Sequence, residues 1–391
     1  MDFTPTEEQT AARDLAARIF GDLSTHERLA AAGTGSDAEL WKELCAAGLV
    51  AAVADIGLLG LVLLLEEQGR TTAQVPFAVS CVYGLLAVTA HGSGEQRERL
   101  LPGIGDGTVV VSGAVSGPGA VRESASGRLS GVLPVVPWLR DATHVLVADD
   151  RRRLWLVRTA EAVCEPVELT APWSAGRLTL DGTPGERLGA PTGRADVSDG
   201  APAGRADVSE GASAGRADGS EAAGGADAAE TAGHADPPVS AYDDVLATAR
   251  IAFAGLQAGV CAGSLARAVE HTNAREQFGR PLAAKQGVQL RAADAYMDTE
   301  AIRVTAYEAA WRRDEGLPYA SHALTAAWWA SEAGQRVVHA GQHLHGGTGA
   351  DLEHPVHRHF LWGRQLDAYL GCGSEVLQEL GELIVSGEVE T

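Results

Sequence analysis

Positive charge is scarce in this chain. Lysine is nearly absent, and lysine and arginine together number 31 against 52 aspartates and glutamates, which gives a formal net charge of −21. Proteins that bind nucleic acid or anionic membranes present basic residues to the phosphates. The shortage therefore argues against both kinds of partner, and we expect a soluble, cytoplasmic protein.

Paired cysteines are also missing. The five cysteines are scattered and form no CxxC pair. They are Cys45, Cys81, Cys164, Cys261 and Cys372. An odd, dispersed set is typical of reduced, buried thiols in a cytosolic protein and not of a disulfide framework. The N-terminal stretch MDFTPTEEQTAARD is acidic and has no apolar segment, so no signal peptide is expected.

Long hydrophobic runs are absent as well. The most apolar run, IGLLGLVLLL at 56–65, has about half the length that a bilayer requires, and it is predicted to be a core helix. Hydrophobic residues nevertheless make up 45% of the 391 positions, which is enough for a sizeable core. The length allows two or three domains, or one large multilayered unit.

Residues 1–107 are predicted to form a helical domain. TEEQTAARDLAARIF places apolar residues at helical spacing behind a threonine cap, with acidic residues in the first turn. ELWKELCAAGLV repeats the pattern and ends near Gly48, and further helices follow at 56–65 and in CVYGLLAVTAHG. The Pro-Gly and Gly-Asp-Gly signals of RLLPGIGDG mark a boundary at 102–107.

Residues 108–189 are predicted to form a small antiparallel barrel or sandwich. Short β-rich runs separated by turn residues support this, namely TVVVSGAV, RLSGVLPVV, ATHVLVAD, RRLWLVRT and GRLTLDG. Residues 190–238 differ, because GRAD recurs there every 11 residues and Gly, Ala, Ser and Asp dominate. Such a segment cannot offset the entropy of ordering, so we predict a disordered low-complexity insertion.

Residues 239–391 are predicted to form a helical bundle with at least four long segments. The first segment carries Gly255, Gly259 and Gly263 at i, i+4 spacing, which lets a neighbouring helix approach closely. Polar residues on the same helix, among them Arg250, argue against a membrane span. The order of helices, strands and helices predicts an α+β fold.

One motif, AREQFGRPLAAKQ at 274–286, lies between two long predicted helices. It places Arg275, Gln277 and Arg280 around a Phe-Gly turn, where donors and an aromatic ring could meet a phosphate-bearing planar ligand. From composition alone, a helix–helix corner with charged caps is the simpler interpretation.

A second motif is QHLHGGTGADLEHPVHRHF at 342–360. Its double glycine frees backbone amides for close approach to a ligand. His343, His345, His354 and His357 raise the alternative of a metal site. However, HxH followed by HxxH has no carboxylate or cysteine set at standard ligand spacing, so no metal site is predicted.

Together, RxQFGRPL followed by a glutamine and then HGGxGxxxEHPxxRxF resemble the acyl-CoA dehydrogenase family. Weaker matches, EEQGR at 66–70 and RLLPGIGDG, extend the resemblance to almost the whole chain outside 190–238. The resemblance implies an N-terminal helical domain, a middle β-barrel or sandwich and a C-terminal four-helix bundle. It also implies FAD at a subunit interface of a dimer or tetramer, and α,β-dehydrogenation of an acyl-CoA thioester.

The resemblance implies cofactor roles for seven residues. Arg275 would hold the FAD pyrophosphate of a neighbouring subunit, Gln277 and Phe278 would line the same cofactor, and Gln286 would lie beside it. Three glycines would let the backbone pass close to the adenosine part of FAD, namely Gly346, Gly347 and Gly349.

The catalytic base of the family is missing. Dehydrogenation needs a carboxylate that removes the α-proton while the β-hydrogen leaves as hydride to the flavin. The implied position in DAYLGCGSEVLQELG is Leu370 or Gly371, and the alternative position on the first long C-terminal helix is Ala249. None of these can take a proton, so no catalytic residue is assigned.

Other departures affect the flavin contacts. A Trp-Ile-Thr-like strand of the family becomes Trp138-Leu139-Arg140, so an arginine replaces a hydroxyl, and His343 replaces a glutamine. Some actinobacterial relatives that act on steroid side chains form heterotetramers in which one of two unlike subunits supplies the base. EHPVHRHF is similar to that branch.

The sequence therefore predicts an acyl-CoA dehydrogenase-family flavoprotein of lipid metabolism, working as a base-lacking subunit with a paralogous partner on an acyl-CoA. One alternative is a stand-alone dehydrogenase with a displaced base, for which Glu375, Asp367 and His345 are candidates. Another is a non-catalytic, flavin-free homologue that binds acyl thioesters. Arg140 and His343 favour this last alternative, whereas the retained Arg275 argues against it.

Overall fold

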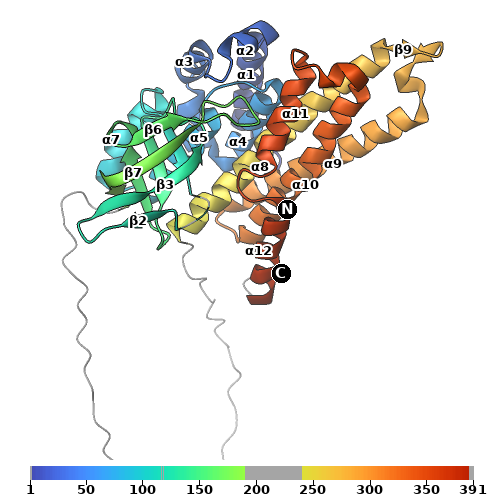
Figure 1. Cartoon of the computed structure of the whole chain (residues 1–391). Helices are drawn as coiled ribbons and strands as arrows, with labels where there is room; N and C mark the ends of the chain where they lie inside the picture. The colour runs from blue at the N-terminus through green and yellow to red at the C-terminus, as the bar shows by residue number, and fades with distance from the viewer. Residues whose placement is uncertain (1, 116, 118, 190–239, 387–391) are drawn as a thin grey trace, which may run out of the picture.

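The computed structural model describes residues 2–115, 117, 119–189 and 240–386. N-terminal helices (blue), a strand-rich middle part (teal and green) and C-terminal helices (yellow to red) follow one another along the chain (Figure 1). The predicted α+β fold is confirmed. The predicted low-complexity insertion at 190–238 falls outside the described residues.

The N-terminal part contains seven α-helices and one π-helix among the described residues. They are α1 Glu7–Leu23, α2 His26–Ala32, α3 Ala38–Ala46, α4 Leu49–Thr71, α5 Phe77–Val79, the π-helix η1 Ser80–Leu86, α6 Ala87–His91 and α7 Gly94–Gly105. The predicted threonine cap of α1 is confirmed, because Thr6 and Gln9 form a capping box. The short α2 was not predicted.

The middle part consists of two four-stranded sheets, ordered β1-β4-β5-β8 and β2-β3-β7-β6. The strands are β1 Val111–Ala114, β2 Val121–Glu123, β3 Arg128–Val136, β4 His144–Ala148, β5 Leu154–Arg158, β6 Val163–Pro166, β7 Gly176–Pro184 and β8 Glu186–Arg187. Buried side chains of both sheets form one cluster, as in a sandwich. The predicted antiparallel arrangement holds except for β1 and β4, which pair in parallel because the chain between them passes through β2 and β3 of the other sheet.

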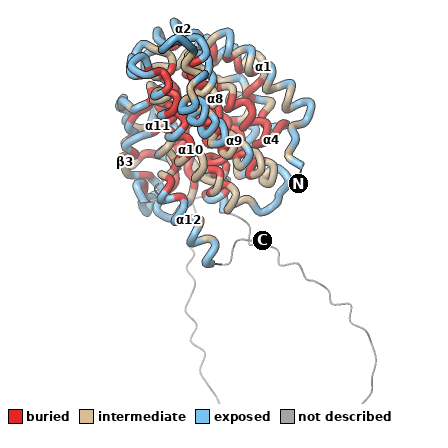
Figure 2. The backbone as a smooth tube through the Cα atoms, turned by 90° about the vertical axis from the view of Figure 1, so that its right-hand side faces the viewer, coloured by how far each residue is buried: buried red, intermediate tan, exposed pale blue. Residues whose placement is uncertain are grey.

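The C-terminal part is built from long helices. Its elements are α8 Ala241–Ala274, β9 Glu276–Gln277, β10 Arg280–Pro281, the 3-10 turn η3 Leu282–Ala284, α9 Gln286–Asp314, α10 Ala320–His345, the 3-10 turn η4 Gly346–Ala350, α11 Pro355–Leu366 and α12 Gly373–Ser386. Buried backbone (red) lies in the interior of the molecule, and exposed backbone surrounds it (Figure 2).

Within the described residues, α4 and α8 are long and apolar enough to cross a membrane, by length and composition only. The apolar run at 56–65 is thus part of a longer helix than the sequence pattern predicted. Of their most apolar windows, 67% in α4 and 83% in α8 is buried inside the molecule, as in core helices of soluble proteins.

The two apolar helices cross each other at backbone distance. A Cβ atom added at Gly259 of α8 would lie 2.1 Å from the Glu66 carbonyl oxygen of α4, and one added at Gly263 would lie 2.3 Å from the Arg70 carbonyl oxygen. A Cβ at Gly69 of α4 would in turn lie 2.2 Å from the Leu256 carbonyl oxygen of α8. The prediction that the glycine stripe admits a neighbouring helix is confirmed, and that helix is α4.

A break in α4 connects it to α9. Gly57 has φ 71° and interrupts the helix, so the segment after it starts afresh. Its first backbone N–H groups, those of Leu58 and Leu59, each donate to the Asp314 carboxylate at 2.9 Å. Asp314 therefore caps this helical segment from the C-terminal end of α9.

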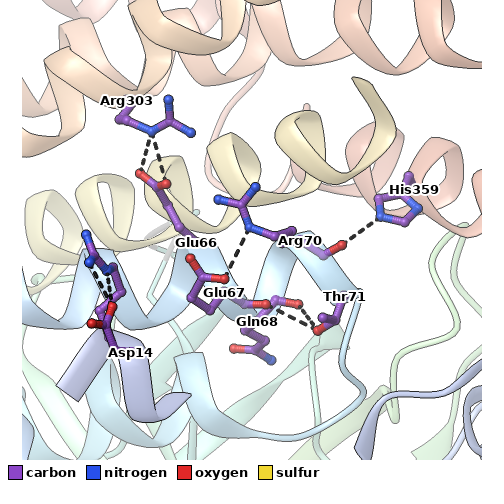
Figure 3. A network of polar contacts seen from close by, with 9 residues as sticks. Asp14, Glu66, Glu67, Gln68, Arg70, Thr71, Arg303 and His359 are labelled. Atoms are coloured by element: carbon purple, nitrogen blue, oxygen red, sulfur yellow. Dashed lines mark hydrogen bonds and ion pairs between the residues drawn. The ribbon is translucent and has the colours of Figure 1, made fainter. Parts of the chain in front are cut away.

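The C-terminal end of α4 is held by polar contacts (Figure 3). The Glu66 carboxylate, only 4% exposed, accepts from Nε of Arg303 in α9 at 3.0 Å. Burial raises the pKa of Glu66, and the Arg303 charge opposes this shift. His359 of α11 donates to the Arg70 carbonyl oxygen at 3.0 Å, and burial lowers its pKa to about 4, so the ring is neutral near pH 7.

We predict opposite effects of alanine at two helical glycines. Gly259→Ala forces a methyl group against the α4 backbone and should destabilise the protein by about 1–3 kcal/mol or more. Gly21→Ala is the matched control, because nothing lies within 4 Å of a Cβ there, and alanine should stabilise exposed α1 by about 0.5–1 kcal/mol. Denaturant unfolding checks both, and a neutral Gly259→Ala would contradict the close crossing.

Candidate functional site

The motif at 275–286 forms an arm between α8 and α9. Its turn residues Phe278 and Gly279 have φ 58° and 75°. Positive φ at both positions matches the twist of a two-residue hairpin, and glycine adopts it freely whereas phenylalanine does not. The Leu282 N–H donates to the Arg275 carbonyl oxygen at 2.9 Å, which closes the base of the arm.

The arm presents its side chains to solvent. Arg275, Gln277, Phe278 and Gln286 are all exposed, and Phe278 is 89% exposed. β9 lies at the far end of the helical bundle (Figure 1). Within the described part of the chain, the Arg275 guanidinium has no ion pair. The donors and the aromatic ring that the sequence analysis singled out are therefore together and available to a ligand outside this subunit.

The glycine motif begins where α10 ends. Gly346 has φ 63°, and a Cβ added at Gly346 or Gly347 would meet nothing within 4 Å. At Gly349 a Cβ would lie 2.2 Å from the Gln342 carbonyl oxygen. The first two glycines thus offer open backbone to a ligand, whereas the third is needed for packing against α10.

Three imidazoles connect the base of the arm to the glycine motif. His271 of α8 stacks on His345 of α10 with ring centroids 4.6 Å apart, and His345 contacts His354 at 5.1 Å. Within the described residues no group of three or more His, Cys, Asp or Glu side chains could hold a metal ion. These ring contacts show that the arm and the glycine motif lie at the same end of the bundle.

The implied base positions lie at the other end of α8. Twenty-five helical steps separate Ala249 from Ala274, which corresponds to about 38 Å along the axis. Ala249 is fully buried, and the neighbouring Arg250 pairs with Glu379 of α12 at 2.7 Å. Arg250 Nε also points to the Leu370 carbonyl oxygen at 3.4 Å, so the two implied base positions are near each other.

Two of the alternative bases have hydrogen-bond partners near the implied base positions, and the third lies at the arm end. Glu375 accepts from the Cys372 N–H at 3.0 Å at the start of α12. Asp367 pairs with Arg364 at 2.7 Å and accepts from the Ser331 hydroxyl at 2.7 Å. The third candidate, His345, belongs to the imidazole cluster at the arm end.

A set of aromatic side chains fills the region beside Leu370, and we call it the aromatic junction. It comprises Tyr83, Trp138, Trp173, Phe253, Trp362 and Tyr369. Trp138 stacks on Trp173 with centroids 4.6 Å apart, and Tyr369 lies 4.6 Å from Phe253. The Tyr83 and Tyr369 hydroxyls are 3.2 Å apart, and burial raises the pKa of both, so neither phenol is a base near pH 7.

The implied flavin-contacting residues Trp138-Leu139-Arg140 lie within this packing, but the expected strand is wrong there, because β3 ends at Val136 and these residues form a turn. Trp138 is fully buried and has φ 51°, an unfavourable conformation for a bulky residue. Arg140 is exposed and donates to the Thr34 carbonyl oxygen of the N-terminal part. The arginine in place of the hydroxyl thus reaches across to another part of the chain.

Sequence reasoning missed several of these residues. Glu379 as the partner of Arg250, and Trp173 and Tyr83 as parts of the junction, carry no local sequence signal because their contacts are distant in the chain. Lys285, whose ammonium lies 4.2 Å from the centre of the Phe278 ring, could have been noticed. It is one of only two lysines in the chain.

Comparisons with known proteins cover most of the chain. The family models described as the acyl-CoA dehydrogenase N-terminal and C-terminal domains match residues 6–108 and 240–380. Among curated proteins, acyl-CoA dehydrogenase FadE27 of Mycobacterium tuberculosis (strain ATCC 25618 / H37Rv) is 30% identical over 97% of this chain and 98% of its own length.

Two solved structures are similar at full length. A variant of the Tcur3481-Tcur3483 steroid ACAD has 36% identity and a TM-score of 0.81, with 98% of this chain and 99% of that chain covered. A chain of the ChsE4-ChsE5 complex from Mycobacterium tuberculosis has 26% identity and a TM-score of 0.81, with 100% of this chain and 100% of that chain covered.

The imidazole cluster predicts a pH-dependent stability. Burial lowers the pKa of His345 and of His354, and the charges of Arg267 and the neighbouring imidazoles add to the effect. As the pH falls below about 6.5, the unfolded chain binds protons that the folded chain does not, so stability falls. The His354 imidazole caps α11, because it accepts a hydrogen bond from the Val356 N–H. His354→Asn keeps a capping side chain at this position and removes one of the three rings.

We therefore expect His354→Asn to lose less stability than the unchanged protein when the pH is lowered from about 7.5 to about 5.5. Thermal melting at the two pH values measures this difference. His343→Asn, at an exposed position outside the cluster, is the matched control. An equal loss in His354→Asn and the unchanged protein would contradict the assignment.

Proposed function

The chain belongs to the acyl-CoA dehydrogenase family of FAD-dependent oxidoreductases, and from this premise we propose that it is the base-lacking subunit of a two-component enzyme. In this proposal it lends its arm to the FAD of a paralogous partner, and the partner provides the flavin-ring site and the catalytic carboxylate. FAD, when bound, would accept the hydride that leaves the acyl-CoA during α,β-dehydrogenation.

The length of α8 is the observation that carries the proposal. The arm and the base region of one subunit lie at opposite ends of this continuous helix, about 38 Å apart along its axis. A single FAD cannot reach both ends. The exposed arm therefore fits the cofactor of a neighbouring subunit and not one that would lie at this chain's own junction.

The region of the aromatic junction supports an unlike neighbour. Trp138, Trp173 and Trp362 are each at most 1% exposed and pack against one another, and among the described residues their indole N–H groups have no hydrogen-bond partner. The implied base positions nearby hold Ala249, Leu370 and Gly371 and carry no carboxylate, and a second copy of this chain would lack one as well. A paralogue that carries a carboxylate there would supply the missing base.

The arm fits the phosphate part of FAD. The exposed Arg275 guanidinium, which has no ion pair among the described residues, can bind a diphosphate through two parallel N–H donors. Gln277 and Gln286 add amide donors, and the exposed ring of Phe278 supplies an apolar surface. At the glycine motif, Gly346 and Gly347 leave the backbone open to an adenosine group, and Gly349 secures the turn against α10.

Two similar structures indicate which kind of assembly and which class of substrate should be tested first. Tcur3481-Tcur3483 and ChsE4-ChsE5 are both two-component systems by name, and this chain is similar to each over at least 98% of its length. The first is described as a steroid ACAD and is 36% identical to this chain. We infer that steroid side-chain acyl-CoA thioesters are the first substrates to test.

A flavin-free homologue that binds acyl thioesters is the second candidate function. The packed junction favours it, because the indole rings are buried against one another and the implied base positions beside them hold Ala249, Leu370 and Gly371. The exposed Arg275 and the open Gly346 and Gly347 favour the two-component enzyme instead.

Absorption spectra separate these functions. The chain is purified alone and co-expressed with a paralogue from the same genome, and anaerobic spectra are recorded before and after addition of acyl-CoA. We expect flavin absorption, bleached by substrate, in the co-expressed complex only. Bleaching by the chain alone would overturn the base-lacking assignment, and a complex without flavin would favour the flavin-free homologue.

Arg275→Gln provides a sharper prediction. Removing one charge-assisted contact to phosphate costs about 1.5–3 kcal/mol, so the complex should bind FAD roughly 10- to 150-fold more weakly. Fluorescence titration of the apo-complex with FAD measures the change. Arg122→Gln, at an exposed arginine of β2, is the matched control and should bind FAD like the unchanged complex. Unaltered affinity in Arg275→Gln would show that the arm does not hold the cofactor.

A further inference from the structure

The tip of the arm has an unusual conformation. Phe278 adopts φ 58°, in the left-handed region that bulky side chains rarely occupy, while its side chain is 89% exposed. Nothing in a buried core therefore holds it in place. An unfavourable backbone conformation persists only where neighbouring groups over-determine it, and such positions cluster at functional sites.

Lys285 is the group that contacts this ring. Its ammonium lies 4.2 Å from the ring centroid of Phe278, within the range of a cation–π interaction. Among the described residues this ammonium has no ion pair. The chain contains only one other lysine, the exposed Lys42.

The backbone of Lys285 is firmly anchored. Its N–H donates to the Leu282 carbonyl oxygen at 3.0 Å, and its own carbonyl accepts from Val288 at 3.0 Å and Gln289 at 3.1 Å in the first turn of α9. The side chain thus reaches from the start of a 29-residue helix back to the hairpin tip. The cation–π contact therefore connects the two-residue turn of the arm to α9.

We propose that Lys285 is a positioning residue that holds Phe278, and through it the whole arm, in the geometry that receives the partner's cofactor. This inference rests on the proposed function of the arm. Because the turn residues and Arg275 belong to one short hairpin, fixing the tip reduces the freedom that Arg275 loses on binding a diphosphate. Preorganisation of this kind strengthens binding without any contact between Lys285 and the ligand.

The contact can be tested on the chain alone. Reductive methylation with ¹³C-formaldehyde labels the two lysines and the N-terminal amine, and it keeps their charge. We expect the Lys285 methyl signal to be shifted upfield of the Lys42 signal by the ring current of Phe278. Phe278→Leu should abolish that shift, and Lys285→Arg assigns the signal by removing it. A Lys285 signal that coincides with that of Lys42, or that is unaffected by Phe278→Leu, would overturn the proposal.

The role is tested in the co-expressed complex. Lys285→Met keeps the length of the side chain and removes its charge, and it should weaken FAD binding by about two- to five-fold, the range of an exposed cation–π contact. Turnover at saturating FAD should be unchanged, because Lys285 does not touch the reacting atoms. Lys285→Arg, which also binds an aromatic face, should restore the affinity, and Lys42→Met is the matched control.

The outcomes distinguish this inference from the function on which it rests. Equal weakening by Lys285→Arg and Lys285→Met would mean that the ammonium itself contacts a ligand, and would overturn the positioning role. Unchanged FAD affinity in Lys285→Met would do the same. An unchanged complex that binds no flavin would overturn the function of the arm, whereas the methyl signals would still decide whether Lys285 holds Phe278.

Discussion

The backbone crossing of α4 and α8 is the constraint on which the rest of the structure depends. With the Gly259 Cβ position only 2.1 Å from the Glu66 carbonyl oxygen, neither helix can rotate or slide without a collision. The path of α8 is thereby fixed over its 34 residues. One end of α8 meets the aromatic junction, and the other end carries the arm.

This geometry places two different kinds of side chains at the two ends of α8. Filling the junction with indole rings stabilises the fold through apolar burial and ring packing. The indole N–H groups of Trp138, Trp173 and Trp362 nevertheless have no hydrogen-bond partner within the described part of the chain. The exposed guanidinium and phenylalanine ring of the arm contribute little to the stability of this chain. The packed aromatic side chains and the exposed arm thus lie at opposite ends of one helix.

The sequence predicts what repeats along the chain and misses what only folding brings together. The capping box at Thr6, the glycine stripe and the α+β order follow from local pattern, and each is confirmed. The parallel pairing of β1 and β4 and the π-helix η1 have no such pattern, because they depend on neighbours distant in the chain. In the site, the implied base positions can be identified singly, and they hold Ala249, Leu370 and Gly371. The closure of the junction cannot be identified in this way, since Tyr83 and Tyr369 are separated by 286 positions.

Asp314 fixes the C-terminal end of α9 to α4. The helix is 29 residues long, about 43 Å, and its C-terminal end is secured by two hydrogen bonds to α4 while its N-terminal end carries the arm. Between these ends α9 packs against α8 and α10, and Arg303 and Asp298 pair with Glu66 and Arg336 along its length. It is therefore supported at several points, like a beam laid on a wall. Bending of α9 would disturb these contacts, so the arm starts from a fixed base.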